Sequence, residues 1–273
     1  MKVIVFDIDN TLGDFTQLGI IWDIVCNYYK LNNQKTLSQQ DFNHLLDMYP
    51  ECLRPNIINI LLFLREKKQH KFCHKIMIYT NNNGSKEWCY HIIKYLEYKI
   101  NYNLFDNVIT AFKLNGKHNE LCRTTHVKCY TDLVKCSKIS KNTEICFIDD
   151  VYHHDMNNSK VYYIHLKPYN YNMNFDTMII RITNSTLYKK DLNNNHFKHY
   201  IREEISDYKY HYTEKDPLEY EVDKIIGKQI IIYLEEFFHK SLRHKSMRHT
   251  NKQQNSSTRK IDKTQDHTND NDV

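Results

Sequence analysis

Short runs of apolar residues, each ending in a polar cluster, recur along the first 170 residues of the chain. Such runs are typical of strands that are buried on both faces of a parallel sheet. We predict five of these strands, at residues 2–6, 75–79, 108–112, 144–148 and 161–166.

Apolar residues at helical spacing fill the segments between the predicted strands. We expect helices within residues 14–31, 34–53, 57–64, 85–99 and 131–139. Pro55 would lie in the first turn of the third of these helices, where proline is tolerated. Strands that alternate with helices predict an α/β fold, with a central parallel sheet flanked by helices and a small helical insert after the first strand.

The pattern changes beyond Tyr169, where an Asn-rich stretch begins. From Pro217 to Phe237 the apolar residues again recur at steps of three and four, which predicts a C-terminal amphipathic helix. We expect this helix to dock on the body of the protein; a helix that binds a partner is the alternative. The chain thus divides into a core at 1–169, in which 14–53 is a helical insert or small cap, a helical extension at 170–238, and a basic tail at 239–273 that we expect to be disordered.

No segment approaches the 18 uncharged apolar residues that a membrane-spanning helix needs. The apolar run at the N-terminus meets Asp7 too early for a signal peptide. We therefore expect an intracellular protein, cytoplasmic or nuclear, that is not secreted and has no membrane partner.

The positive net charge of +5 lies mostly in the tail. Residues 239–273 hold eight Lys or Arg and four Asp, so the other 238 residues hold 30 basic and 29 acidic side chains. A nearly neutral body argues against a nucleic-acid partner for the core. The tail could touch RNA or direct the protein to the nucleus, but a solvated terminus is the simpler interpretation.

The eight cysteines include no C-x-x-C pair. In a chain without an export signal we expect buried free thiols rather than disulfides. Cys122, Cys129 and Cys136 are spaced by seven, which would suit one helix face, but lone thiols are weak evidence for zinc.

Three polar clusters follow predicted strands: Asp7-Ile8-Asp9-Asn10-Thr11, Thr80-Asn81 and Asp149-Asp150. The carboxyl ends of parallel strands are where α/β proteins place their sites. Two carboxylates at one turn suit split roles, in which one oxygen attacks and the other moves a proton. A Mg²⁺ ion would offset their repulsion, and the second acidic pair would supply further oxygen ligands.

These residues resemble the haloacid dehalogenase (HAD) superfamily of phosphatases, whose hallmark is D-x-D-x-[TV] after the first strand. The resemblance extends over residues 1–169: Thr80 ends a strand as in the second motif, and the acidic pair of the fourth motif is Asp149-Asp150. It implies a Rossmann-like HAD fold.

Within the superfamily, the closest resemblance is to the small phosphatases of the RNA polymerase II C-terminal domain, the NLI-interacting-factor-like group. Arg54-Pro55, Phe105-Asp106 and Val127-Lys128 match that group. The chain departs from it at Gly13-Asp14 and in 14–53, which looks helical where the group has a β-stranded insert.

The resemblance implies a role for each residue. Asp7 would attack phosphorus and form an aspartyl-phosphate, and Asp9 would act as general acid and then general base. Thr80, the backbone N–H of Asn81 and Lys128 would bind the substrate phosphate. Mg²⁺ would be the cofactor. Four residues would hold it: Asp7, Asp9 through its backbone carbonyl, Asp149, and Asp150 directly or through water.

Several neighbouring side chains are open to more than one interpretation. Lys113, Lys117 and Lys135 are rivals of Lys128, which we favour because it precedes the helix that leads to Asp149. Arg54 could cap a helix or contact the substrate. We expect four further sets to be structural: Thr11 to fix its turn, Asn82-Asn83-Gly84 to form a turn, His153-His154-Asp155 to form a polar loop, and Trp22 and Trp88 to pack in the core or in the cap.

We expect a Mg²⁺-dependent phosphatase that hydrolyses phosphomonoesters through an aspartyl-phosphate, with a Ser/Thr phosphoprotein substrate implied by the resemblance. A nucleotide or other small-molecule phosphatase is the main alternative, favoured if residues 14–53 form a helical lid. A polynucleotide end-phosphatase is disfavoured by the neutral body. A catalytically silent HAD-fold binding protein is the alternative from another class, and the presence of every acidic motif residue argues against it.

Overall fold

The computed structural model describes residues 1–33, 36–185, 194–206, 208 and 212–239. Most of the tail predicted at 239–273 and part of the Asn-rich stretch lie outside these residues. In the part that is described, no helix is both long and apolar enough to cross a membrane.

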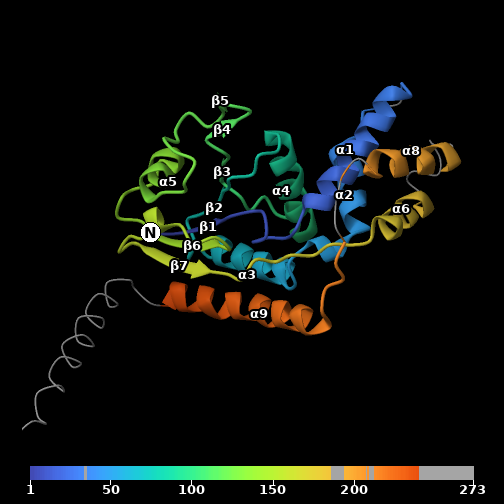
Figure 1. Ribbon diagram of the computed structural model, residues 1–273. Helices are drawn as coiled ribbons and strands as arrows, with labels where there is room; N and C mark the ends of the chain where they lie inside the picture. Colours follow the sequence, from blue (N-terminus) through green and yellow to red (C-terminus); the bar gives the residue numbers. More distant parts are fainter. Residues whose placement is uncertain (34–35, 186–193, 207, 209–211, 240–273) are drawn as a thin grey trace, which may run out of the picture.

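A five-stranded parallel sheet forms the centre of the molecule (Figure 1). Its strand order is β3-β2-β1-β6-β7. The strands are β1 (Lys2–Phe6), β2 (Lys75–Tyr79), β3 (Asn107–Ile109), β6 (Glu144–Asp149) and β7 (Val161–His165). All five predicted strands are therefore confirmed, although β3 ends three residues earlier than expected. The class is α/β, as predicted.

Helices flank both faces of the sheet. Alternate residues of β1 point to opposite faces: Ile4 and Phe6 pack in a large core with α3 and α9, and Val3 and Val5 pack in a smaller core with α5. The flanking helices are α3 (Ile57–Gln69), α4 (Lys86–Ile100), α5 (Tyr130–Ser137) and α9 (Pro217–His239).

A group of helices lies beside the sheet, at the right of Figure 1. Two come from the segment after β1, and two come from the segment after β7, which packs against the first pair. Their bounds are α1 (Thr16–Leu31), α2 (Gln39–Asp47), α6 (Phe175–Asn184) and α8 (Asn194–Ser206). The sequence predicts a helical extension over 170–238 but does not locate α6 and α8 within it, because Asn-rich stretches interrupt the apolar pattern there.

Short elements complete the chain. A 3₁₀ turn, η1 (Pro50–Cys52), follows α2, and a second, η2 (His154–Met156), follows β6. A two-stranded hairpin, β4 (Lys113–Leu114) and β5 (Lys117–His118), projects from the end of β3.

Pro55 does not lie inside α3 as expected. Asn56, in the left-handed conformation with φ of 69°, is the N-cap, and the helix begins at Ile57. The proline instead meets α9, because its carbonyl lies against Gly227.

Helix α9 docks on the body, as predicted, and the C-terminal half of its predicted apolar face is buried, whereas the N-terminal half is not. Leu218, Val222 and Ile225 were expected to be buried and are exposed. Asp223 and Gly227 lie on the buried face with three apolar residues: Ile230, Leu234 and Phe237. Asp223 is tolerated there because Lys215 pairs with its carboxylate at 2.5 Å.

The expectation that no cysteine forms a disulfide is wrong for one pair. Cys122 and Cys136 are bonded, and the six others are free thiols. The loop after β5 folds back on α5, which brings the two Cα atoms within 5.2 Å although 14 positions separate them. Since Cys122 lies before α5 and Cys129 is its N-cap, the three cysteines do not share one helix face.

Candidate active site

Asp7 and Asp149 meet at one edge of the sheet because β1 and β6 are neighbours. The two strands are in register, with Phe6 opposite Ile148, so the next residue of each strand reaches the same level. The backbone N–H of Asp7 donates to the Ile148 carbonyl at 3.0 Å. The two acidic motifs, 142 positions apart in sequence, are thus adjacent in space.

Three buried carboxylates gather at this edge. Asp7, Asp149 and Asp150 each present an oxygen, and these oxygens all lie within 4.8 Å of one another. Asp7 is 6 % exposed, Asp149 is fully buried and Asp150 is 8 % exposed. Carboxylates this close and this buried repel one another unless a cation lies among them.

Lys128 supplies one such cation. Its Nζ donates to Asp149 Oδ2 at 2.7 Å and lies 2.8 Å from Asp7 Oδ1, with the side chain almost fully buried. The rival lysines lie elsewhere: Lys113 and Lys117 are on the hairpin, and Lys135 is within α5. Of the four candidates, Lys128 is therefore the one that the structure brings to the carboxylates.

Thr11 joins the two acidic loops rather than only fixing its own turn. Its hydroxyl donates to Asp150 Oδ1 at 2.8 Å and accepts from the Asp150 backbone N–H at 3.0 Å. This pair of hydrogen bonds sets the orientation of the Asp150 side chain toward the site.

Arg54 holds the loop that carries Asp7 and Asp9. Its buried guanidinium donates to the carbonyls of three residues: Asn10, Thr11 and Lys167. The described contacts of Arg54 thus give it a structural role that neither interpretation, a helix cap or a substrate contact, had offered. The arginine replaces water as the partner of loop carbonyls that would otherwise be buried unpaired.

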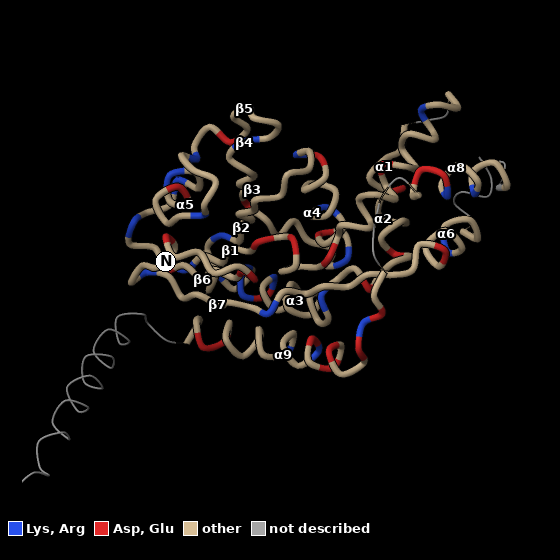
Figure 2. Tube along the Cα trace, in the orientation of Figure 1, with Lys and Arg blue, Asp and Glu red and all other residues tan. Residues whose placement is uncertain are grey.

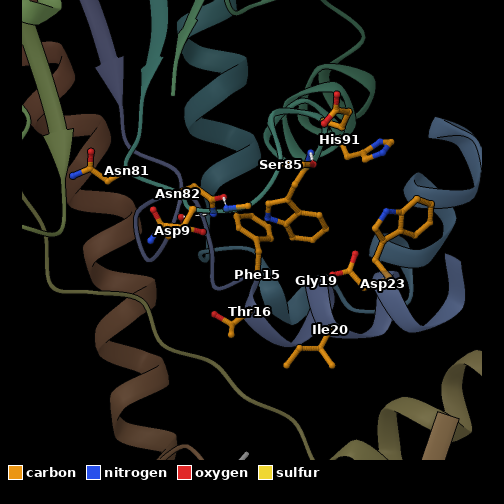
Figure 3. Close-up of a pocket in the computed structure, with 15 residues that line it drawn as sticks. Asp9, Phe15, Thr16, Gly19, Ile20, Asp23, Asn81, Asn82, Ser85 and His91 are labelled. Carbon is orange, nitrogen blue, oxygen red and sulfur yellow. Dashed lines mark hydrogen bonds between the residues drawn. The ribbon is translucent and has the colours of Figure 1, made fainter. Parts of the chain in front are cut away.

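Asp9 is not one of the three clustered carboxylates and is held by Asn82. Asn82 Nδ2 donates to Asp9 Oδ2 at 2.7 Å, and Asn82 Oδ1 accepts from the Gly84 N–H at 2.8 Å (Figure 3). The backbone N–H of Asn82 also donates to Thr80 Oγ1 at 3.1 Å. Asn82 was interpreted as turn chemistry alone, so sequence reasoning missed its contact with the predicted general acid.

Thr80 lies at the end of β2, beside β1 and fully buried. Arg123, which sequence reasoning did not single out, donates to the Thr80 carbonyl at 3.1 Å and to the Thr110 carbonyl at 2.9 Å. Asn81 is exposed and lies at the opposite end from His91 in Figure 3. The Arg123 guanidinium ties the ends of β2 and β3 together by binding both carbonyls. It thereby fixes where Thr80 lies.

His153 approaches the cluster more closely than a solvated loop residue would. Its Nε2 lies 3.6 Å from Asp149 Oδ2, and its backbone N–H donates to the Tyr163 hydroxyl at 3.1 Å. Our preference for a simple polar loop at 153–155 is wrong for His153, although His154 and Asp155 are exposed.

Burial and charge shift the pKa values of these groups in different directions. Burial raises the pKa of Asp7 to about 6, against the opposing effect of Lys128. Burial also raises the pKa of Asp9 and of Asp150. For Asp149, burial is outweighed by hydrogen bonds from His153, Lys128 and the Val151 N–H, so its pKa is lowered.

The donor set fits a hard divalent cation. Three Asp side chains gather at this edge of the sheet, and Lys128 pairs with two of them, Asp7 and Asp149. A raised pKa at Asp7 means that its negative charge is incompletely balanced within the protein. Mg²⁺ prefers such carboxylate oxygens and would supply the missing positive charge. Asp7, Asp149 and Asp150 are the side chains that could hold it.

A pocket of about 750 Å³ opens beside Asp9 (Figure 3). One wall is α1, with Phe15, Gly19 and Trp22, and the other is the loop after β2 with the start of α4, including Trp88. The helical segment predicted at 14–53 thus contributes a wall next to the site. Trp22 is buried in the core and Trp88 is half-buried against it, and both line this pocket.

Comparisons with known proteins add nothing to this geometry. No family model matches the chain, and neither a curated protein nor a solved structure gives a match.

Proposed function

We propose that this protein is a Mg²⁺-dependent phosphatase of the HAD type that hydrolyses phosphomonoesters through an aspartyl-phosphate on Asp7. The observation that carries the proposal is the convergence of Asp7, Lys128 and the Asp149-Asp150 pair at one sheet edge. Three distant segments of the sequence supply them. Their order along the chain and their positions after β1, before α5 and after β6 are those that the resemblance implies.

The first half-reaction transfers the phosphoryl group to the enzyme. A carboxylate oxygen of Asp7 attacks phosphorus in line, and the bond from phosphorus to the leaving oxygen breaks. Asp9 gives its proton to that oxygen, and its raised pKa helps it to carry a proton. Lys128 and the Thr80 hydroxyl bind the phosphate oxygens, and bound Mg²⁺ would offset the charge shared by the carboxylates and the phosphate.

The second half-reaction restores the enzyme. Asp9, now ionised, removes a proton from a water molecule, whose oxygen attacks phosphorus. The bond between phosphorus and Asp7 breaks, which releases inorganic phosphate and the free carboxylate. Asn82 keeps the Asp9 carboxylate in one orientation for both steps, since its amide is itself fixed by Gly84.

Two substrate classes remain candidates. The family resemblance favours a Ser/Thr phosphoprotein. The helical wall formed by α1 favours a small phosphomonoester, because it turns the space beside Asp9 into a pocket of the size that holds small ligands. The near-even mix of acidic and basic residues over the body, visible in Figure 2, gives no support to a nucleic-acid substrate.

The test of this proposal is hydrolysis of a generic aryl phosphate with and without Mg²⁺. We expect Mg²⁺-dependent turnover by the wild-type protein and a loss of at least about a thousandfold in Asp7→Asn, which keeps the shape but removes the nucleophile. Equal rates for the two proteins would contradict the proposal and would favour a binding protein that has kept the fold without its chemistry.

A further inference from the structure

The pocket beside Asp9 is placed where the leaving group of a substrate would lie. Of the four acidic motif residues, Asp9 is the one that lines it. A general acid must reach the oxygen that departs, so the group attached to that oxygen extends from Asp9 into the pocket. This inference rests on the function proposed above and concerns which leaving group the pocket accepts.

Aromatic rings form the inner wall of the pocket. Trp22 and Trp88 both pack edge-on against Phe42, at centroid distances of 5.2 and 5.6 Å, and His91 stacks on the same ring at 5.0 Å. The Trp88 ring lies against Gly19 of α1, where an added Cβ would be 3.4 Å from the indole. The rings are therefore held in place by α1, α2 and α4 before a ligand arrives.

The charged side chains that line the pocket are all acidic. Besides Asp9 these are Asp23 on α1 and Glu87 on α4, the helices of the two walls, and both are exposed to solvent. Among the described residues that line the pocket there is no Lys or Arg. Burial lowers the pKa of His91, which keeps that ring neutral near pH 7.

The aromatic rings and the carboxylates that line the pocket both favour a positively charged ligand. An ammonium group gains from the face of a Trp ring and from nearby carboxylates, whereas a second anionic group would be repelled with no basic residue to receive it. We propose that the pocket selects a small phosphomonoester whose leaving group carries a positive charge. A phosphopeptide would have to place its chain in a pocket closed on one side by α1, so the small ester is favoured over the phosphoprotein.

The charge of the leaving group can be varied while its shape is kept. Three phenyl phosphates serve as probes, with an aminomethyl, a hydroxymethyl or a carboxylate group in the para position. At pH 7 we expect kcat/KM to fall about fivefold from the cationic to the neutral ester, and about fivefold again to the anionic ester.

The double variant D23N/E87Q tests whether these two carboxylates cause the preference. Both side chains are exposed, so their amides are not expected to affect folding. In this variant the differences in kcat/KM among the three esters should shrink severalfold, mainly through changes in KM. Because the variant and the wild type act on the same three esters, the ratio of their rates cancels the intrinsic reactivity of each leaving group. Glu221→Gln, an exposed change on α9 away from the pocket, is the matched control and should leave the spread unchanged.

The outcomes separate this inference from the proposed function. If none of the esters is hydrolysed with Mg²⁺, the phosphatase proposal itself fails. If all three are hydrolysed at similar rates, or the anionic ester is preferred, the phosphatase proposal stands and the cationic specificity is wrong. A phosphoserine peptide with higher kcat/KM than the cationic ester would likewise overturn the inference and restore the phosphoprotein substrate.

Discussion

Asn82 is the residue whose role in the site is most specific. Its side chain is fixed by the Gly84 N–H on one side and donates to Asp9 on the other. A carboxylate that is free to rotate spends part of its time in orientations from which it cannot transfer a proton. In the proposed mechanism, Asn82 is thus a positioning residue that acts through Asp9.

Asn82→Ala should reduce kcat by about tenfold to a hundredfold, which is part of the usual contribution of a positioned acid or base. The loss should be larger for an alkyl phosphate than for p-nitrophenyl phosphate, because a poor leaving group needs the proton from Asp9 more. Steady-state rates with the two esters measure this difference.

Asn27→Ala, an exposed Asn on the distant part of α1, is the control and should leave both rates unchanged. An equal loss for the two esters in Asn82→Ala would indicate a structural effect and would contradict a role in proton transfer.

The main side chains of the site could be predicted from the sequence, and their supports could not. Asp7, Asp149 and Lys128 stand at fixed places relative to strands or helices, so their meeting follows from strand order in a parallel sheet. Arg123 and His153 reach the site through loops whose paths no local pattern sets. Their contacts depend on tertiary packing alone.

At the scale of elements, buried strands were easier to predict than small helices. The helices α6 and α8 carry readable signals: Asn174 caps α6 by accepting from the Asp176 N–H, and the buried residues of α8 recur at steps of four. Surrounding Asn residues obscured both. The hairpin of β4 and β5 was also missed, although Asn115-Gly116 is a typical hairpin turn and both residues have positive φ.

Helix α9 depends on Gly227 for its close packing. A Cβ at this position would lie 2.3 Å from the Pro55 carbonyl oxygen, so Gly227→Ala must push α9 away from the residues that follow Arg54. We expect a loss of about 1–3 kcal/mol in the free energy of unfolding, even though Ala is the better helix former by about 1 kcal/mol. Urea unfolding measures the difference.

Gly19→Ala is the matched control within another helix. Its added Cβ would lie at an ordinary distance of 3.4 Å from Trp88, so we expect little change or a small gain in stability. Equal effects of the two substitutions would show that helix propensity, not the contact with Pro55, determines the result at Gly227.

The turn η1 and the helix α6 are joined by an ion pair that should make stability depend on pH. Arg181 donates to both carboxylate oxygens of Glu51 at 2.9 Å. Burial alone would raise the pKa of Glu51, but the hydrogen bonds from Arg181 outweigh it and lower the pKa. The stabilisation is therefore present near neutral pH and is lost as the pH falls below the usual pKa of about 4.5.

Glu51→Gln should lower the unfolding free energy by about 0.5–1 kcal/mol at pH 7, since the pair is partly exposed, and by less at pH 4. Thermal unfolding at the two pH values tests this dependence, with Glu221→Gln as an exposed control. A loss of unfolding free energy in Glu51→Gln that is the same at pH 7 and pH 4 would contradict a contribution from the charged pair.

At the scale of the whole molecule, the sheet and the helices beside it have separate tasks. The sheet brings the acidic loops together at the carboxyl ends of β1 and β6. Arg54 fixes the loop after β1 by donating to its carbonyls, and Arg123 ties the ends of β2 and β3 together. The helices beside the sheet contribute α1, which walls the pocket next to Asp9. In the proposed mechanism, the chemistry and the choice of substrate therefore fall to different parts of one fold.

The most direct test of the central claim is to locate the phosphoryl group on the enzyme during turnover. The protein is mixed with Mg²⁺ and an aryl phosphate, quenched in acid within the first turnover, digested and mapped by mass spectrometry. The account predicts a phosphorylated carboxylate in the peptide that contains Asp7, and its absence when Mg²⁺ is omitted or Asp7 is replaced by Asn. Full turnover with no phosphoryl group on that peptide, or the same turnover by Asp7→Asn, would contradict it.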